Sequence, residues 1–146
     1  MRRAGVDDAE ALSEIARAAY EMYVTRIGRE PAPMGADYET LIATSRVWLI
    51  ERAHNPIGLL VTRPTRDHLL IENIAVIPAE QGHGIGSQLL DRAELDAAEA
   101  GLKELRLYTN EAMTENLTYY SHHGFIETHR ATQEGYRRVF FRRPLP

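Results

Sequence analysis

The hexapeptide Gln-Gly-His-Gly-Ile-Gly at residues 81–86 constrains the fold of this chain more than any other feature. Residues 69–77, just before it, are mostly aliphatic and include several β-branched residues, which predicts a buried strand. Residues 87–100, just after it, carry apolar side chains at helical spacing and stop at Gly101, which predicts a helix. The chain therefore passes from a strand to a helix through a glycine-rich turn.

Such a turn is a favourable place to bind a phosphate or pyrophosphate. Backbone N–H groups at a helix start have no partner within the helix, and the helix dipole adds partial positive charge there. The P-loop pattern is not met, because Gly86 is followed by Ser87 without the required lysine. The dinucleotide fingerprint is not met either, because the three glycines alternate and lie in the middle of the chain. A tight strand-to-helix turn that binds nothing is the alternative left open.

The composition excludes several classes of protein. The 146 residues are 44% hydrophobic and 26% charged, so we interpret residues 1–146 as one globular domain. The absence of cysteine excludes disulfides and a cysteine nucleophile, and no histidines have metal-ligand spacing, so no metal is expected. The net charge of −4 argues against nucleic acid as a partner, and no apolar stretch approaches the roughly 20 residues of a membrane span. We therefore expect a cytoplasmic protein with no nucleic-acid or membrane partner.

The rest of the chain mixes helical and strand patterns without a repeat or a linker, which favours a single α/β domain. Glycine and proline residues at 28, 31, 33 and 35 predict that residues 26–37 form a loop. Helices are predicted over residues 7–17, 38–44 and 114–123, and strands over 47–51, 57–62, 102–109, 125–130 and 137–142.

Two motifs in order resemble the GNAT superfamily of acyl-CoA-dependent N-acetyltransferases. The family's loop pattern, Gln/Arg-x-x-Gly-x-Gly/Ala, is met by Gln81, Gly84 and Gly86. Its later pattern, Tyr-x-x-x-Gly-Phe/Tyr, is met by residues 120–125. The resemblance implies an α/β (α+β) fold in a single GNAT-like domain, with a mixed, mostly antiparallel sheet of six to seven strands and helices on both faces.

The resemblance also implies the reaction, in which an amine attacks the thioester of acetyl-CoA directly within a ternary complex. The glycine turn would bind the pyrophosphate, and side chains there would crowd it. The strand before the turn would pair with the pantetheine arm, and the amide of Val76 would stabilise the oxyanion. A non-catalytic acyl-CoA-binding module is the alternative function. The implied cofactor-binding residues are Ile74, Ala75, Val76, Gln81, Gly82, His83, Gly84, Ile85, Gly86 and Ser87.

Two side chains are candidates for proton transfer. Glu72 lies on the strand predicted to line the cofactor, and apolar surroundings would raise its pKa towards that of a useful base. The alternatives are that Glu72 faces solvent or pairs with an arginine, and Glu111 and Tyr108 are weaker candidates for the base. Tyr120, four residues before Gly124, stands where the family keeps the tyrosine that protonates the CoA thiolate. The alternative for Tyr120 is packing on an amphipathic helix.

The acceptor side is less constrained by the sequence. In the fold implied by the resemblance, residues 18–37 wall the acceptor site, and Tyr20, Tyr23 and Arg26 lie there, with Asn73 on the neighbouring strand. The two tyrosines are one helical turn apart and would alternatively complete the core. A small-molecule amine is slightly favoured over a protein amine, and family analogy suggests a homodimer.

Four arginines, at positions 137, 138, 142 and 143, form a basic run near the C-terminus. We interpret them as charges on an edge strand, where they discourage pairing with another sheet. Contact with nucleic acid is the less favoured explanation.

Overall fold

A computed structural model describes residues 1–146 and contains one seven-stranded sheet in the order β1-β2-β3-β4-β5-β7-β6. Only β4 and β5 run parallel, and every other neighbouring pair is antiparallel. The mixed, mostly antiparallel sheet predicted from the sequence is therefore confirmed. The strands are β1 (Arg2–Arg3), β2 (Arg46–Arg52), β3 (Asn55–Pro64), β4 (Leu69–Val76), β5 (Glu104–Asn110), β6 (Ile126–Gln133) and β7 (Tyr136–Pro144).

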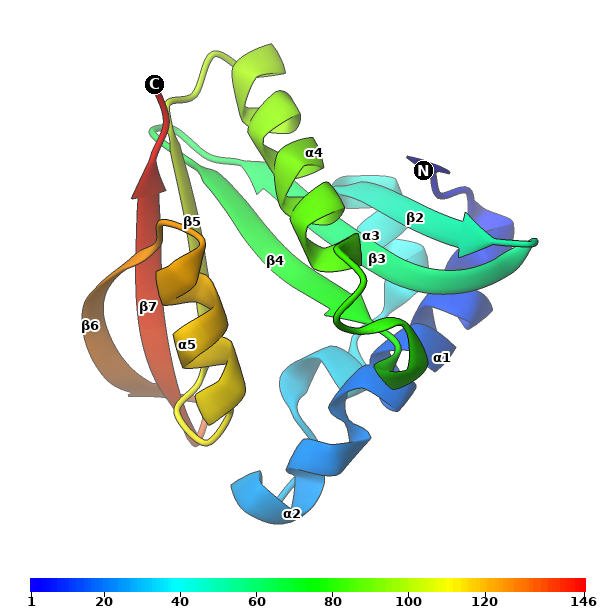
Figure 1. The fold of residues 1–146 in the computed structure, drawn as a ribbon, viewed down its shortest axis with the longest axis horizontal. Coiled ribbons are helices and arrows are strands. Elements are labelled where there is room, and N and C mark those ends of the chain that lie inside the picture. The colour runs from blue at the N-terminus through cyan, green and yellow to red at the C-terminus, as the bar shows by residue number, and fades with distance from the viewer.

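Helices cover both faces of the sheet, as predicted, with α4 and α5 on the face nearer the viewer and α1 and α3 behind it (Figure 1). None of these helices combines the length and the apolar character that crossing a bilayer requires. The helices are α1 (Ala9–Tyr20), α2 (Val24–Ile27), α3 (Tyr38–Thr44), α4 (Ile85–Glu99) and α5 (Thr114–His122), with short 3-10 turns at Val6–Asp8, Glu21–Tyr23, Ala32–Gly35 and Pro78–Glu80.

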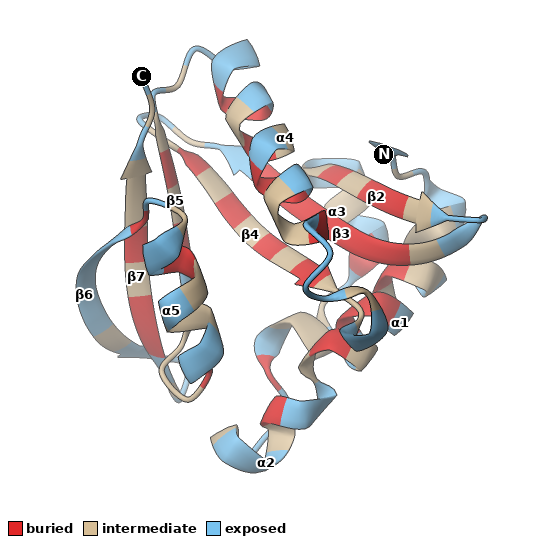
Figure 2. Ribbon diagram, in the orientation of Figure 1, coloured by how far each residue is buried: buried red, intermediate tan, exposed pale blue.

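The core consists of two apolar clusters, one on each face of the sheet. Leu59 and Val61 of β3 pack under α1, whereas Leu60 between them packs under α4. This alternation is what strand geometry requires when both faces are covered. Figure 2 shows the result, with buried positions running through the central strands and β6 exposed along almost all of its length.

Strands β4 and β5 touch at one end and then separate, which opens a gap in the middle of the sheet (Figure 1). Their pairing is limited to Leu69 with Leu105 and Leu70 with Arg106. The N–H of Ile77 donates to β3, at 2.9 Å from the carbonyl oxygen of Ile57. Because successive N–H groups of a strand point to opposite edges, the N–H of Val76 points into the gap.

A β-bulge interrupts β4 beside the gap. Val61 pairs with Asn73 and Thr62 pairs with Ile71, so Glu72 is the extra residue. As a result, Ile71 packs in the cluster under α4 while Asn73 hydrogen-bonds to Tyr38 on the opposite face. A bulge re-aims the side chains beside it, and bulges are frequent next to functional sites.

Two local predictions in the N-terminal region need correction. Helix α1 begins at Ala9 rather than residue 7, because Val6–Asp8 form a 3-10 turn in which the Asp8 carboxylate accepts from the N–H of Gly5. The stretch over residues 26–37 is not a continuous loop. It holds the end of α2, which stops at the left-handed Gly28, and a 3-10 turn at Ala32–Gly35.

The interpretation of the basic run as an edge strand is wrong. Strand β7 lies between β5 and β6, so β6 forms the edge. Three of the four charges are instead neutralised by ion pairs, with Arg137 at 2.7 Å from Glu111, Arg142 at 2.8 Å from Glu104, and Arg143 beside Glu94. Alternating charge along a strand indicates which of its faces is polar. It does not indicate which strands are its neighbours, because the strand order depends on the topology of the whole sheet.

Candidate active site

Two cavities meet at the gap between β4 and β5. The turn-side cavity, of about 500 Å³, extends towards the glycine turn and α4. The loop-side cavity, of about 300 Å³, lies under the segment of residues 31–36 and is walled by β4, β5 and β7. Four residues line both cavities and mark the place where they join: Tyr20, Ile74, Asn116 and Tyr120.

The turn-side cavity is lined by every residue that the sequence assigned to cofactor binding except His83. The imidazole of His83 is more than half exposed and lies 3.7 Å from the Glu80 carboxylate. The structure therefore does not bring His83 into this cavity. The predicted residues that line it are Ile74, Ala75, Val76, Gln81, Gly82, Gly84, Ile85, Gly86 and Ser87.

Free backbone donors gather where the turn meets α4. The helix begins at Ile85, two residues earlier than predicted, and its first intrahelical bond runs from the N–H of Gln88 to the carbonyl of Gly84 at 3.1 Å. The N–H groups of residues 85–87 therefore have no partner within the helix. Together with the helix dipole they form a site for an anion at the wall of the cavity.

The structure gives the glycines of the turn further reasons beside the predicted crowding of a phosphate, which stays a prediction. Gly82 and Gly84 adopt φ angles of +81° and +80°, a left-handed conformation that side chains disfavour. A Cβ on Gly86 would collide with the hydroxyl of Tyr119. The amide of Gln81 donates to the carbonyl oxygen of Val76 at 3.0 Å, so this motif residue closes the turn onto the end of β4.

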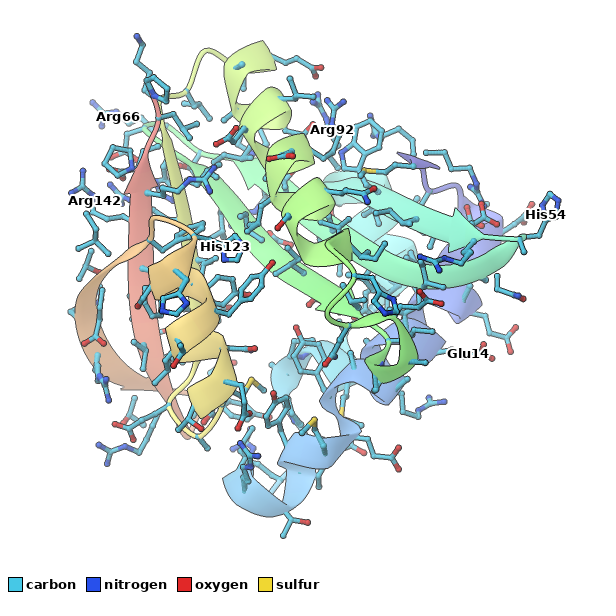
Figure 3. All side chains as sticks on the ribbon, viewed as in Figure 1. Glu14, His54, Arg66, Arg92, His123 and Arg142 are labelled. Atoms are coloured by element: carbon cyan, nitrogen blue, oxygen red, sulfur yellow. The ribbon has the colours of Figure 1, made fainter.

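Helix α5 contributes a face that the sequence prediction did not include. The Tyr119 ring stacks on the His123 imidazole at 4.1 Å between centroids, and Nε2 of His123 lies 3.3 Å from Oγ of Ser87. Figure 3 shows His123 on α5 at the side that faces α4. Helical spacing is the sequence signal that could have identified these residues, because residues three and four positions apart share one face of a helix. The α5 residues that line the turn-side cavity are Glu115, Asn116, Tyr119, Tyr120 and, at its C-terminal end, His123.

Tyr120 is 7% exposed and reaches the junction of the two cavities from α5. Its ring packs against Phe125 and Phe141 at centroid distances of 5.6 and 5.9 Å. Burial, with a smaller contribution from the neighbouring Tyr119, raises the pKa of the Tyr120 phenol well above its usual range. The side chain is therefore a neutral proton donor at physiological pH. Packing and a chemical role are compatible, because only the ring edge and the hydroxyl need to reach the cavity.

Tyr20 and Asn73 lie on the β4 side of the junction. The hydroxyl of Tyr20 is 2.8 Å from Oδ1 of Asn73 and 3.0 Å from the carbonyl oxygen of Ile74. The Asn73 amide donates to the hydroxyl of Tyr38 at 2.9 Å. Burial raises the pKa of Tyr20 well above its usual range. Both predicted residues line the loop-side cavity, but their polar groups are already engaged with the protein.

Glu72 lines the loop-side cavity, as predicted, but its surroundings are not apolar. One carboxylate oxygen lies 2.6 Å from Nε of Arg63, and the other lies 3.5 Å from Oγ of Ser45. The prediction of apolar surroundings is therefore wrong, because the bulge turns Glu72 to the face where Arg63 projects. Its assignment as the base remains a prediction.

The other predicted side chains are distributed unevenly. Tyr23 lines the turn-side cavity and donates to Glu115 at 3.1 Å. Arg26 pairs with Glu115 at 2.8 Å and lines neither cavity.

Of the two weaker candidates for the base, Tyr108 lines the loop-side cavity, whereas Glu111 lines neither. Hydrogen bonds from Arg130 and Arg137 lower the pKa of the Glu111 carboxyl. The structure has no group of three or more His, Asp or Glu side chains placed to hold a metal ion.

Comparison with known proteins places this geometry in a family. A family model described as "Acetyltransferase (GNAT) domain" matches residues 43–127. The PaiA N-acetyltransferase from Thermoplasma acidophilum in complex with coenzyme A is 18% identical, with a TM-score of 0.81 over 98% of this chain and 96% of that chain. A GNAT family acetyltransferase from Elizabethkingia anophelis with acetyl-CoA bound is 22% identical, with a TM-score of 0.68 over 90% and 89%. The ribosomal-protein-S18-alanine N-acetyltransferase from Escherichia coli is 15% identical, with a TM-score of 0.73 over 99% and 92%. At these identities the likenesses show a shared fold.

Proposed function

Because the chain belongs to the GNAT family of acetyltransferases, whose members take the acetyl group from acetyl-CoA, we propose that it acetylates a small primary amine. The observation that carries the proposal is the junction of two cavities at Tyr120, with free backbone donors in one cavity and charged side chains in the other. Two substrates entering from opposite sides would meet there, as direct transfer in a ternary complex requires.

Acetyl-CoA occupies the turn-side cavity in this proposal. Its pyrophosphate accepts hydrogen bonds from the N–H groups of residues 85–87, and its pantetheine arm lies along the open edge of β4. The N–H of Val76 points into the gap and donates to the thioester carbonyl oxygen. That contact strengthens when the oxygen gains negative charge in the tetrahedral intermediate, so it accelerates the reaction.

The amine enters from the loop-side cavity and must lose a proton before its lone pair attacks the thioester carbon. Glu72, on the wall of that cavity, accepts the proton directly or through a water molecule. The ion pair with Arg63 fixes the direction of the carboxylate, whose second oxygen lies 3.5 Å from Oγ of Ser45. The carbon–nitrogen bond forms as the amine attacks, and the carbon–sulfur bond breaks as the tetrahedral intermediate collapses.

Tyr120 protonates the departing CoA thiolate. A buried phenol with a raised pKa is a weak acid towards a thiolate in water, but this thiolate forms in the same buried junction. Burial raises the proton affinity of the sulfur as well, since the charged form of either group loses its hydration. The proton therefore moves between two groups that are desolvated together, and solvent later restores the phenol.

The first experiment is thermal unfolding with acetyl-CoA, CoA, ATP and NAD in parallel. A ligand at about 100 times its dissociation constant stabilises the folded state by roughly 2.7 kcal/mol, which gives a clear shift in a protein of this size. Stabilisation by acetyl-CoA and CoA alone supports the proposed donor, and release of free thiol with an amine panel supports transfer. Binding without release on any amine would instead favour a non-catalytic acyl-CoA-binding module.

A further inference from the structure

Asp96 and Arg138 are the two buried charged residues of the protein, and their surroundings differ sharply. Asp96, 1% exposed, accepts hydrogen bonds from the guanidinium groups of Arg46 and Arg92 and from the indole of Trp48. Arg138, 9% exposed, has no carboxylate partner. Buried charges are normally paired, so an unpaired one requires an explanation.

The protein holds the Arg138 guanidinium without neutralising it. Nη1 donates to Oε1 of Gln133 at 2.8 Å. The guanidinium carbon lies 4.4 Å from the centre of the Tyr108 ring and 5.6 Å from that of Tyr136. These aromatic contacts fix the plane of the group. A guanidinium carries five N–H donors, and a single one of them is bonded within the protein.

The neighbouring arginines show that carboxylates are available along this strand. Arg137 pairs with Glu111, Arg142 pairs with Glu104, and Arg143 pairs with Glu94. Arg138 is the one member of the basic run that lines the loop-side cavity. Its free donors therefore belong to the cavity that would receive the acceptor.

The charges around the loop-side cavity do not balance. Three charged side chains line it, and two of them, Arg63 and Glu72, pair with each other at 2.6 Å. Arg138 leaves one net positive charge. Since the amine must be neutral when it attacks, an acceptor that carries one negative charge balances the cavity.

We propose that Arg138 binds a carboxylate of the acceptor, so that the acceptor is a small amine that also bears a carboxylate. This inference rests on the proposed acetyl transfer. A guanidinium binds a carboxylate through two parallel hydrogen bonds, and a monoanion matches the single unbalanced charge. A phosphate monoester carries roughly −1.5 to −2 and matches it less well. A volume of about 300 Å³ suits a small molecule.

The β6–β7 hairpin, which carries Arg138, is held in place, and this favours a small acceptor over a protein segment. The hydroxyl of Tyr136 donates to the carbonyl oxygen of Glu30 at 2.5 Å, and Nη1 of Arg29 donates to that of Glu134 at 3.1 Å. These bonds tie the β6–β7 hairpin to Arg29 and Glu30, the two residues just before the segment that covers the cavity. The acceptor must therefore fit between this hairpin and the segment of residues 31–36.

The test measures kcat/KM with acetyl-CoA for matched pairs of amines, each an amino acid and its carboxamide, over several chain lengths. One further arm uses amines that carry a phosphate, and another uses polyamines. We expect the carboxylate member of the best pair to exceed its carboxamide at least tenfold. Arg138→Gln should lower kcat/KM for that carboxylate by about 10- to 100-fold and change the carboxamide less than about threefold, as loss of a charged hydrogen bond predicts.

Two matched variants accompany Arg138→Gln. Arg137→Gln removes the adjacent charge, which points away from the cavity and is 73% exposed, and it should leave both members of each pair unchanged. Arg138→Lys retains the charge without the planar fork and should keep part of the preference for the carboxylate. Thermal unfolding of Arg138→Gln should stay within a few degrees of the wild type, because no protein carboxylate is left unpaired.

The outcomes separate this inference from the proposed function. Equal rates for carboxylate and carboxamide, a better rate for phosphate-bearing amines or polyamines, or an equal loss on both members in Arg138→Gln would each overturn the carboxylate assignment while leaving acetyl transfer intact. Binding of acetyl-CoA without turnover of any pair also overturns it. Failure of acetyl-CoA itself to bind overturns the proposed function. If Arg138→Gln does not fold, Arg138→Lys provides the test. It should keep part of the preference for the carboxylate over the carboxamide, and an equal loss on both members would overturn the assignment.

Discussion

The two cavities that meet at Tyr120 are built from different parts of the chain. The turn-side cavity offers backbone N–H groups from residues 85–87 and from Val76, in positions set by left-handed glycines and a helix start. The loop-side cavity offers side chains from four strands and a covering segment, with Glu72 and Arg138 among them. A site made of backbone recognises a ligand by the shape of the fold. A site made of side chains changes its preference with single substitutions.

The largest expected effect lies at the junction of the two cavities. Tyr120→Phe removes the proton donor to the thiolate, and kcat should fall by about 10²- to 10⁴-fold, the range typical of general acids. The KM for acetyl-CoA should change less than about threefold, because the phenol ring stays in place. Steady-state kinetics with free-thiol detection measures both values. Tyr119→Phe, one residue away on the same helix, is the control and should leave kcat within about twofold. Weakened acetyl-CoA binding with normal kcat in Tyr120→Phe would contradict the assignment.

A smaller effect is expected in the side-chain-built cavity. Glu72→Gln removes the proposed base, and kcat/KM near neutral pH should fall by about 10- to 100-fold. The deficit should shrink as the pH rises towards the pKa of the amine, because the acceptor then deprotonates in solution. A pH–rate profile of the variant against the wild type measures this convergence. A deficit that is the same at every pH would indicate that Glu72 only positions Arg63 or the acceptor.

The backbone-built cavity should respond to a change in shape. Gly86→Ala places a methyl group against the Tyr119 hydroxyl, so Tyr119 must shift into the cavity proposed to hold acetyl-CoA. We expect the KM for acetyl-CoA to rise about tenfold, with kcat nearly unchanged, because the loss is one of uniform binding. The double variant Gly86→Ala/Tyr119→Phe removes the hydroxyl that collides and should regain most of the affinity. No recovery in the double variant would show that the glycine is required for contact with the ligand itself.

The smallest expected effect is the absence of a decline in the wild-type rate at high pH. Burial raises the pKa of Tyr120, so the phenol stays protonated well beyond the ordinary tyrosine value of about 10. The wild-type rate should therefore rise with pH as the amine loses its proton and show no decline below about pH 10 from loss of the acid. A profile over pH 6 to 10 with a saturating donor measures this. A descending limb near pH 8 would show that another group, with a lower pKa, supplies the proton.

The sequence predicts the turn-side cavity well because its determinants are local. The left-handed Gly84, the helix start after it and the strand before it follow one another within a few residues. Tyr120 is located by its distance from Gly124 in the chain. Tyr119 and His123, which the sequence prediction did not include, lie four residues apart and share one face of this helix.

The loop-side cavity depends on contacts between distant parts of the chain, and sequence reasoning does not reach them. The bulge at Glu72 is visible only in the register of β4 against β3. The position of Arg138 depends on β7 entering the sheet between β5 and β6, and its lack of a partner depends on where Glu111 and Glu104 lie. Four arginines in one run are alike in sequence and differ only in which carboxylate, if any, each one meets.

The open edge of β4 is only half open, and this has a consequence for solubility. An unpaired strand in the middle of a sheet is a template for strands of other molecules, which leads to aggregation. Here the hydroxyl of Tyr20 binds the carbonyl of Ile74, and the amide of Gln81 binds that of Val76. With the acceptor half of the ladder occupied, a foreign strand cannot add its full set of hydrogen bonds. The free N–H of Val76 can still bind a carbonyl oxygen of a ligand, so the contacts that shape the site should also hinder pairing with foreign strands.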